Sequence, residues 1–483
     1  MNKIIALPVL VAGSALLSGC FDGSSSTPRT DVRVIHAVSD APSVNVSFNG
    51  EALVAGADFK QAATLRPNRG NYSVDVDALL PTGDELTVIS VPNTRLDAGT
   101  RYDIIATGSV TGDDIEPVVL ADDGQRDDPN SARVRVAHLS PAADSAAPAV
   151  SVFVTANGAD LPADPAFSFS FRDSVGPLEL DAGTYQIRVT AEGSTDVVYD
   201  SGAVELPAGS DLLIAAIDNT VYGESPISLL VINGSDTSEI LSAGTGADIR
   251  AVHNVSNLGA GNETPEATAV DVYVNAEPGT SDPATFSFGD TLPVDAFTGA
   301  YVIGGTGGEP GVYDIVVTAS GSTEPAIEAA LELVAGDLKT IVAVETAEGL
   351  GALAFADDNR RIATAAKLRL IHGAFAEVAQ TVDVYLVPTA EGGAAETVIG
   401  NLAGSPTIPG FEFGSTTGYL QVPAGSYVAF ITEGDNPANV LFKSPDLGLE
   451  VNNVYTAVAR LALSSEEQIA GVTLLDDFIE MPR

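Results

Sequence analysis

Cysteine, tryptophan, histidine and positive charge are all scarce in this sequence of 483 residues. Cys20 is the one cysteine, which excludes an internal disulfide, so the fold must be held by burial and backbone hydrogen bonds. Tryptophan is absent, and we expect small aliphatic cores with a few Phe and Tyr. Only 22 Lys and Arg face 65 Asp and Glu, and the resulting formal charge of −43 excludes nucleic acid as a favourable partner because phosphates would be repelled. An apolar content of 45% still indicates a globular protein.

All four histidines occur in one repeated motif, Arg-x-x-His. The motif appears as Arg33–His36, Arg135–His138, Arg250–His253 and Arg369–His372. Successive copies are separated by roughly 100 to 120 residues, which is the length of a small domain. The sequence therefore predicts four tandem copies of one module.

The module boundaries follow from the repeated order of strands and turns. We expect repeats at residues 31–123, 132–236, 247–358 and 366–478. Polar linkers are expected at 124–130 and 237–246. Within each repeat, short alternating segments are interrupted by turn signals every 8 to 12 residues or so, and helical periodicity is nearly missing. This pattern predicts an all-β protein made of antiparallel β-sandwich modules of about seven strands, arranged as an elongated row.

Two further positions recur for structural reasons. Gly99, Gly209 and Gly336 share a slot that Asn452 fills in the last repeat, and Gly and Asn most easily accept a left-handed backbone, so we predict a turn with positive φ. A Gly-x-Tyr motif places a tyrosine at the start of a strand, where it can bury its ring and return its hydroxyl to the backbone, much like a tyrosine corner. The four tyrosines are Tyr72, Tyr185, Tyr313 and Tyr427.

The N-terminus has the pattern of an export signal. A charged start is followed by an apolar run, Ile4–Leu17, that is too short for a comfortable membrane span. Leu17-Ser18-Gly19-Cys20 resembles the bacterial lipoprotein lipobox, which implies cleavage before Cys20 and acylation of that cysteine. We therefore expect a signal peptide at 1–19, a flexible tether at 20–30, and anchoring to the cell envelope at the outer membrane. An ordinary signal peptide with a chance cysteine is the alternative.

The histidines do not assemble a recognisable catalytic or metal site. Each lies in a different repeat, so together they cannot supply the three or four close ligands of a zinc ion. Ser39 and Asp40 beside His36 look like fragments of a catalytic triad, but Phe375 and Ala376 take their places in the last repeat. The favoured interpretation is that each histidine ends the first strand and hydrogen-bonds to the following loop, while the arginines are solvated or paired to carboxylates. We accordingly predict no catalytic residue, no metal ligand and no cofactor.

Acidic pairs near the module junctions leave one metal hypothesis open. Asp122–Asp123, Asp127–Asp128 and Asp357–Asp358 could contribute to calcium sites, which need six or more oxygens and would stiffen the row of modules. A solvated acidic linker is the alternative.

The first repeat also resembles a known family. Val-Arg-Val-Ile-His36-Ala-Val-Ser-Asp-Ala-Pro-Ser-Val-Asn-Val, with its three echoes, is similar to the bacterial domain of unknown function 4397, which occurs as repeats in exported or lipid-anchored proteins. The resemblance implies an immunoglobulin-like β-sandwich at the cell surface, and it supplies no catalytic residues.

The leading functional hypothesis is a non-enzymatic, lipid-anchored envelope protein that displays its modules or binds a surface polymer or protein. One rival is an extracytoplasmic hydrolase that uses a carboxylate pair in a loop. It predicts a pocket where two carboxylates, or a histidine and a carboxylate, converge. The second rival is a calcium-stiffened adhesin, which predicts that a chelator lowers the melting temperature.

Overall fold

The computed structural model describes residues 28–221, 223–255, 269–287, 289, 291–292, 309–376, 379–389, 406–462 and 470–478. Within these residues the regular structure is almost entirely β, and the one helix is α1 (Pro141–Ala146). No helix in this part of the chain is long and apolar enough to cross a membrane. The all-β prediction is therefore confirmed.

The strands form eight small sheets, which occur as four sheet pairs along the chain. The first sheet pair contains β1 (Asp31–His36), β2 (Val44–Phe48), β3 (Glu51–Ala57), β4 (Ala62–Leu65), β5 (Gly70–Leu79), β6 (Glu85–Leu96), β7 (Arg101–Thr107) and β8 (Glu116–Asp122). The second sheet pair contains β9 (Ala132–His138), β10 (Ala149–Ala156), β11 (Phe167–Ser170), β12 (Ser174–Leu180), β13 (Gly183–Ala191), β14 (Val197–Leu206), β15 (Asp211–Asp218), β16 (Ile227–Asn233) and β17 (Asp236–Ile240).

The third sheet pair contains β18 (Asp248–His253), β19 (Ala269–Val274), β20 (Ala284–Ser287), β21 (Thr291–Leu292), β22 (Gly311–Ala319), β23 (Pro325–Leu333), β24 (Leu338–Thr346) and β25 (Gly349–Ala356). The fourth sheet pair contains β26 (Ala366–His372), β27 (Thr381–Pro388), β28 (Ile408–Glu412), β29 (Thr416–Val422), β30 (Gly425–Glu433), β31 (Asn436–Lys443), β32 (Leu447–Leu449), β33 (Val454–Leu461) and β34 (Ala470–Asp476). One expected linker is wrong. Residues 237–240, at the start of the expected linker 237–246, belong to β17, which pairs with β16 at the edge of its sheet.

In each sheet pair we call the sheet that contains the Arg-x-x-His strand the histidine sheet and the other the partner sheet. The histidine sheets have the orders β4-β1-β7-β8, β12-β9-β15-β16-β17, β21-β18-β24-β25 and β29-β26-β33-β34. The partner sheets have the orders β3-β2-β5-β6, β11-β10-β13-β14, β20-β19-β22-β23 and β28-β27-β30-β31, with β32 added beside β30.

The expectation of purely antiparallel sheets is wrong at one pairing in each histidine sheet. The histidine strand runs parallel to the strand that follows the glycine turn, as for β1 beside β7 and β26 beside β33. The physical reason is the connection. The chain leaves the histidine sheet to build the partner sheet before it returns, and such a long crossover allows two strands to run in the same direction.

The recurring turn and tyrosine positions behave as predicted. Gly99, Gly209 and Gly336 have φ of 74°, 75° and 84°, and Asn452 has φ of 63°. Each tyrosine hydroxyl donates to the backbone carbonyl four residues upstream, at 2.7 Å for Tyr72, 2.8 Å for Tyr185 and 2.7 Å for Tyr427, and Tyr313 makes the same bond to Glu309. These bonds fix the entry of one partner-sheet strand in every pair.

The sheet pairs are not independent bodies. In β1, Val32 and Val34 face the interior of the first sheet pair, whereas Ile35 on the opposite face packs against Leu213 and Ile232 of the second pair. The third and fourth pairs pack in the same way, with Val252 and Val342 against Ile371. The histidine strands are therefore buried on both faces, and each half of the molecule has a core shared by two sheet pairs.

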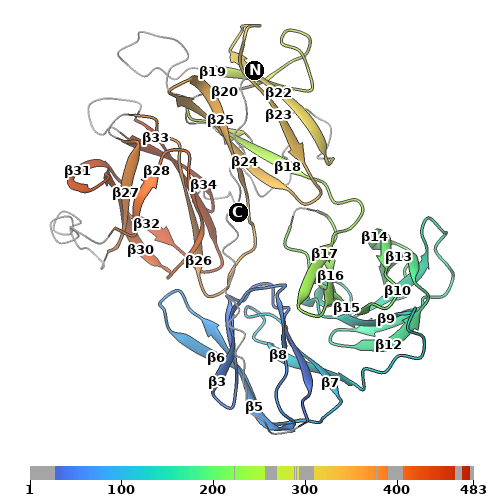
Figure 1. Ribbon diagram of the computed structural model, residues 1–483. Helices are drawn as coiled ribbons and strands as arrows, with labels where there is room; N and C mark the ends of the chain where they lie inside the picture. The colour runs from blue at the N-terminus through green and yellow to red at the C-terminus, as the bar shows by residue number, and fades with distance from the viewer. Residues whose placement is uncertain are drawn as a thin grey trace.

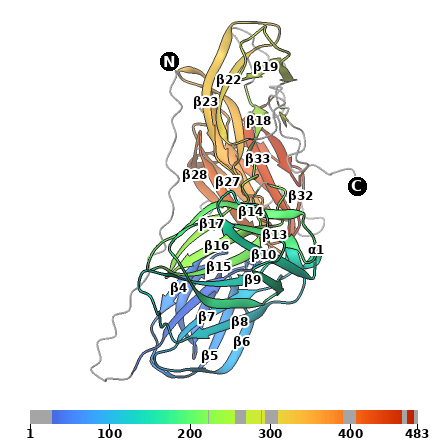
Figure 2. The same ribbon diagram turned by 90° about the vertical axis from the view of Figure 1, so that its right-hand side faces the viewer.

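The predicted elongated row is also wrong. The connection between β25 and β26 returns to the first sheet pair. There the Arg360 guanidinium binds Asp58 at 2.7 Å, and the Ala363 N–H donates to the Asp40 carbonyl at 2.8 Å. Figure 1 shows the first and fourth sheet pairs side by side, and Figures 1 and 2 show the third pair at the end of the molecule farthest from the first. Packing of histidine sheets in twos buries faces that a simple row would leave exposed, and the contacts of Arg360 and Ala363 then join the two halves.

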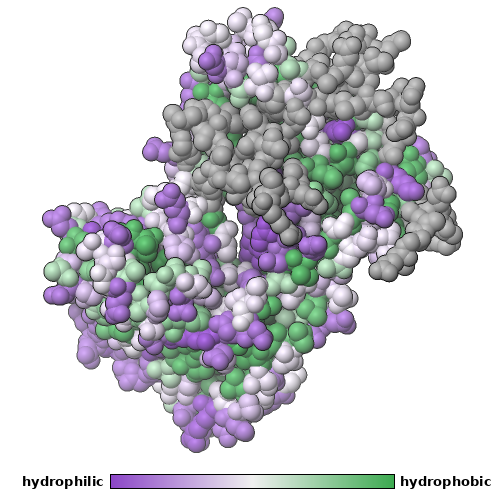
Figure 3. All heavy atoms as spheres, turned by 180° about the vertical axis from the view of Figure 1, so that it is seen from behind, coloured by the Kyte–Doolittle hydropathy of each residue, from purple (hydrophilic) through white to green (hydrophobic). Residues whose placement is uncertain are grey.

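The surface is mixed in polarity. On the face shown in Figure 3, hydrophilic and apolar residues are interspersed over the lower half, which the first and second sheet pairs occupy. Such interspersion is ordinary for a solvated protein surface, so it does not by itself indicate a binding face.

Candidate functional site

The histidines fasten the loops that follow their strands. The Nδ1 atoms of His36, His138 and His253 each accept the backbone N–H two residues further along, at 3.3 to 3.4 Å. The Nε2 atom of His36 lies 3.1 Å from the Pro42 carbonyl, and that of His372 lies 2.8 Å from the Ala379 carbonyl. Because a carbonyl only accepts, Nε2 carries the proton in these two rings and Nδ1 is left as an acceptor.

Burial favours the neutral form of His36, His138 and His372. The exposed fraction is 3% or less for all four histidines. Burial lowers the pKa of His36 and of His372 to about 4, and it also lowers the pKa of His138. Neutral, backbone-bonded rings of this kind hold loops in place and are poorly suited to exchange protons with a substrate.

Ser39 and Asp40 do not complete a triad with His36. Ser39 donates to Asp218 of the second sheet pair at 2.7 Å. Asp40 accepts hydrogen bonds from Ser109, Val110 and Thr111, so it holds the loop after β7. Both side chains are therefore engaged away from the histidine.

The four arginines lie at the contacts between sheet pairs. Arg33 pairs with Asp103 at 2.8 Å and donates to the Ile232 carbonyl of the second pair at 3.3 Å. Arg135 pairs with Asp122 of the first pair at 3.1 Å. In the other half, Arg250 pairs with Asp357 and with Asp476 of the fourth pair, and Arg369 reaches back to Asp357 at 2.6 Å.

The sequence analysis left these arginines either solvated or paired to carboxylates. The structure shows the pairing, together with burial and a contact with a second sheet pair that the sequence analysis did not predict. Their exposed fractions run from 1% for Arg369 to 8% for Arg33. Removing one member of a buried ion pair of this kind costs about 3–5 kcal/mol of unfolding free energy, because it leaves the other charge buried alone.

Among the junction carboxylates, Asp122 and Asp357 are bound by arginines. Burial alone would raise the pKa of Asp122, but hydrogen bonds from Arg133 and Gly124 hold this pKa below its usual range. Asp357 binds both Arg250 and Arg369, and Asp358 binds Lys367 at 2.8 Å. Among the residues that the structure describes, no group of three His, Cys, Asp or Glu could hold a metal ion.

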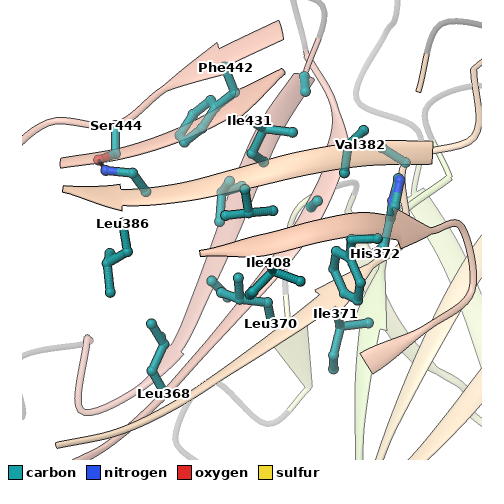
Figure 4. Close-up of a pocket in the computed structure, with 18 of the residues that line it drawn as sticks. Leu368, Leu370, Ile371, His372, Val382, Leu386, Ile408, Ile431, Phe442 and Ser444 are labelled. Atoms are coloured by element: carbon teal, nitrogen blue, oxygen red, sulfur yellow. Dashed lines mark hydrogen bonds between the residues drawn. The ribbon is translucent and has the colours of Figure 1, made fainter. Parts of the chain in front are cut away.

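The fourth sheet pair encloses an apolar cavity of about 330 Å³, which we call the fourth-pair cavity. The equivalent spaces in the third, second and first pairs measure about 80, 40 and 30 Å³. The fourth-pair cavity is lined from both sheets, and the lining includes Leu368, Leu386, Ile408, Ile431, Phe442 and Ala457. Figure 4 shows Leu368, Leu386 and Ser444 toward one end of this space and His372 and Val382 toward the other.

Two alanines account for the extra volume at the centre. The strand beside the histidine strand carries Ile104, Ile214 and Ile341 in the first three pairs, and Ala457 in the same register in the fourth. Two residues after the corner tyrosine, the partner sheets carry Val74, Ile187 and Ile315 in the first three pairs and Ala429 in the fourth. Leu370 and Leu386 are larger than several of their counterparts and restore only part of the missing volume.

An empty apolar space of this size inside a core is expensive. At the cost measured for buried cavities, it would lower the unfolding free energy on the order of 8 kcal/mol, which is comparable to the whole stability of a small domain. The sequence analysis missed this cavity. Comparison of Ala429 and Ala457 with their counterparts in the other repeats was the available signal.

The polar side chains that line the cavity are few, namely Thr407, Ser444, His372 and Arg460. Arg460 donates to the Thr473 hydroxyl at 3.2 Å and to the Leu461 carbonyl at 3.0 Å. Ser444 accepts the Ala429 N–H at 2.8 Å and donates to the Pro445 carbonyl at 2.7 Å, so its hydroxyl is satisfied. The Nδ1 atom of His372, in contrast, is buried and has no hydrogen-bond partner. In the other three copies the same atom accepts a loop N–H. No Asp or Glu is among the described residues that line the cavity.

Comparison with known proteins identifies one family. The model of the family described as "Domain of unknown function (DUF4397)" matches residues 30–153, 143–261 and 256–385, so it reaches into β27 and covers only the beginning of the fourth sheet pair. Three tandem matches confirm the predicted resemblance for that part of the chain, and the fourth copy stays a prediction. No curated protein matches the sequence. Cys20 and the signal peptide lie outside the described residues.

Two solved structures share a weak similarity. The Bacillus anthracis TIE protein aligns at 10% identity over 86% of this chain and 66% of its own length, with a TM-score of 0.13. A candidate cell adhesion protein from Bacteroides fragilis aligns at 9% identity over 49% of this chain and 99% of its own length, with a TM-score of 0.12. TM-scores this low do not establish a shared fold.

Proposed function

The chain belongs to the DUF4397 family, and from this premise we propose that it is a non-catalytic, lipid-anchored cell-envelope protein whose four immunoglobulin-like sandwich modules form a rigid scaffold for binding. The fourth sheet pair is then a fourth copy of the module. It has the same strand order, the same parallel pairing at the histidine strand and the same tyrosine bond, here from Tyr427 to Pro423, as the other three.

One observation carries the non-catalytic part of the proposal. The residues with the greatest chemical capacity in the repeat are engaged in holding the scaffold. The arginines are buried in ion pairs between sheet pairs, and the histidine rings are buried, with neighbouring loop backbone as their partners. A side chain with these partners is not available to a substrate without unfolding its loop or interface.

The hydrolase alternative needs carboxylates that converge on a pocket. Asp103, Asp122 and Asp211 do surround a small cleft of about 10 Å³ between the first and second sheet pairs. Each of the three is bound by an arginine, namely Arg33, Arg133 and Arg101. This charge balance favours a structural role for the cluster over general acid or base catalysis.

The lipid anchor is tested directly at Cys20. Cells that produce the chain are fed an alkyne-tagged fatty acid, and the tag is then visualised on the purified protein. We expect label on the wild-type protein and none on Cys20→Ala, with Ser18→Ala as the control that retains the cysteine. Equal labelling of wild-type and Cys20→Ala proteins would refute acylation at this residue.

The binding role is tested with the region from Phe21 onward, which contains every residue that the structure describes. The screen uses arrays of glycans and of envelope proteins, with a panel of ester, peptide and glycoside substrates run in parallel. We expect specific binding and no turnover. Turnover that disappears in Asp122→Asn or Asp211→Asn would instead establish the hydrolase alternative.

A further inference from the structure

The fourth-pair cavity differs from an ordinary packing defect in its position and its composition. It lies between the two sheets of the fourth pair, where the other three pairs are packed more closely, and its volume is about four times that of the next largest of these spaces. The difference arises at Ala457 in one sheet and Ala429 in the other, so both walls recede at the middle of the same space. The topology does not require the hollow, because the same topology is filled three times in this chain.

The lining of the cavity extends along the strands of both sheets. Leu368 and His372 are four residues apart on β26, and Leu386 and Val382 are four residues apart on β27. Because strands rise about 3.3 Å per residue, the lining extends about 13 Å along the sheets. A volume of about 330 Å³ spread over that length has a mean cross-section of about 25 Å², which is enough for one extended alkyl chain and too little for two side by side.

The lining selects an apolar occupant. Its side chains are almost all aliphatic or aromatic, and an apolar cavity excludes water while admitting hydrocarbons. A cavity of about 150 Å³ holds six-carbon benzene, so by proportion this one holds about a dozen carbon atoms.

One polar atom at the cavity lacks a partner. His372 lines the end opposite Ser444 and Leu386, and its exposed fraction is 1%. Its Nε2 atom lies 2.8 Å from the Ala379 carbonyl and therefore carries the proton, which leaves Nδ1 as a buried acceptor with no partner. An acceptor in this state is complemented by a hydroxyl group or a protonated acid group.

We propose that the fourth-pair cavity binds one linear aliphatic chain of about a dozen carbon atoms, with its hydroxyl or protonated acid group at the His372 end. This inference deepens the proposed binding function by naming a ligand class. It does not depend on acylation of Cys20, and its failure would leave the surface-binding role intact.

The test uses residues 21–483 purified without detergent, because a detergent tail would occupy the same space. Dodecan-1-ol is added, and binding is measured by native mass spectrometry and by the shift in melting temperature. Cyclododecanol, with the same number of carbon atoms in a ring, is the shape control. We expect a one-to-one complex and a higher melting temperature with dodecan-1-ol, and at least ten-fold weaker binding of cyclododecanol.

The cavity is located by filling it. In the double variant Ala429→Ile, Ala457→Ile, each alanine acquires a branched side chain of the type found at that position in the other three pairs. We expect this variant to melt at a higher temperature than the wild type without ligand and to lose at least nine-tenths of its dodecan-1-ol binding. Ala330→Ile makes the same substitution at an exposed position of β23 and should bind as the wild type does. If the double variant does not fold, each single substitution is measured instead and should weaken binding separately.

The remaining outcomes overturn the proposal. Failure of the wild type to bind dodecan-1-ol, together with a more heat-stable double variant, would show a void without a ligand. Undiminished binding by the filled variant would place the ligand elsewhere. Equal binding of the linear and cyclic alcohols would reject the linear shape, and equal binding of dodecan-1-ol and its methyl ether, which cannot donate a hydrogen bond, would reject the role of His372.

Discussion

The two halves of the molecule are built to the same plan but are filled to different degrees. In the first half, the first and second sheet pairs have interior spaces of about 30 and 40 Å³, and eleven buried residues form the core that they share. In the second half, the third and fourth pairs have spaces of about 80 and 330 Å³, and six buried residues form the shared core. The second half therefore has both the emptier interiors and the smaller shared core.

The ion pairs across the two interfaces differ in how the arginines of the repeated motif share carboxylates. In the first half, Arg33 and Arg135 use different carboxylates, Asp103 and Asp122. In the second half, Arg250 and Arg369 both bind Asp357. In the first half Asp122 also binds Arg133, so each half contains an aspartate that bridges two arginines, but only Asp357 bridges the two arginines of the repeated motif. The comparison teaches that a shared topology sets where the interfaces lie, while a few side chains set how much each half depends on them.

The largest expected effect is acid unfolding, which should act on both halves. Burial lowers the pKa of His36 in the first half and of His372 in the second to about 4, from 6.5. Between pH 4 and 6.5 the unfolded chain therefore binds more protons than the folded chain. The contribution of the two neutral rings to stability is complete above pH 6.5 and is lost as the pH falls towards 4. The loss is about 3 kcal/mol for each histidine and about 6 kcal/mol for both.

This pH dependence is measured as the free energy of unfolding in urea at a series of pH values. His372→Gln should reduce the slope between pH 6.5 and 4 by about one proton, and His36→Gln should do the same. An unchanged slope in both variants would mean that other groups, rather than these rings, control acid unfolding.

The next largest effect is expected at Asp357 in the second half. Asp357→Ala leaves two buried guanidinium groups without their shared carboxylate, and we expect a loss of about 3–5 kcal/mol of unfolding free energy. Asp97→Ala is the control, because its pair with Arg95 is exposed and should contribute less than about 1 kcal/mol. Similar losses in the two variants would contradict the importance assigned to the Asp357 cluster.

A cavity introduced into the first half should make it resemble the second. Ile104→Ala places in the first pair the side chain that Ala457 has in the fourth, and we expect a loss of about 2–4 kcal/mol, measured by urea unfolding. Val119→Ala is the control, because it also shortens an aliphatic side chain but does so at an exposed position of β8. The loss of unfolding free energy should be smaller there, since no cavity is created. A loss no greater than that of the control would indicate that the first pair already tolerates a hollow interior.

The smallest effect should be equal in the two halves. Tyr185→Phe and Tyr427→Phe each remove one hydroxyl that donates to a backbone carbonyl, at 2.8 and 2.7 Å. We expect each to lower the unfolding free energy by about 1 kcal/mol. A clearly larger loss for Tyr427→Phe would show that the hollow fourth pair depends more on its corner tyrosine than the filled second pair does.

The sequence predicted what is encoded locally. Alternation in Val32-Arg33-Val34-Ile35 predicted a strand, the repeated glycine slot predicted a turn of positive φ, and the Gly-x-Tyr motif predicted a hydroxyl bonded to the backbone. Each of these depends on a few neighbouring residues, so one sequence is enough to recognise it.

The sequence analysis failed where the outcome depends on distant segments. Ile35, Ala137, Val252 and Ile371 all lie on the arginine face of the histidine strand, and such a second apolar face was a signal of burial on both sides. Parallel pairing of β1 with β7 depends on the path of the whole intervening chain. The fourth-pair cavity depends on the difference between corresponding residues in two sheets, which periodicity does not measure.

The face-to-face contact of histidine sheets has a consequence for how a protein of this kind can grow. Each half is a stack of four layers, and its two middle layers cover each other. A stack with an unmatched unit would present Val252 and Val342, or their counterparts, to water. Extension by duplication is therefore favoured in blocks of two units, and a recombination event that added a single unit would create an adhesive surface that must find another copy to cover it.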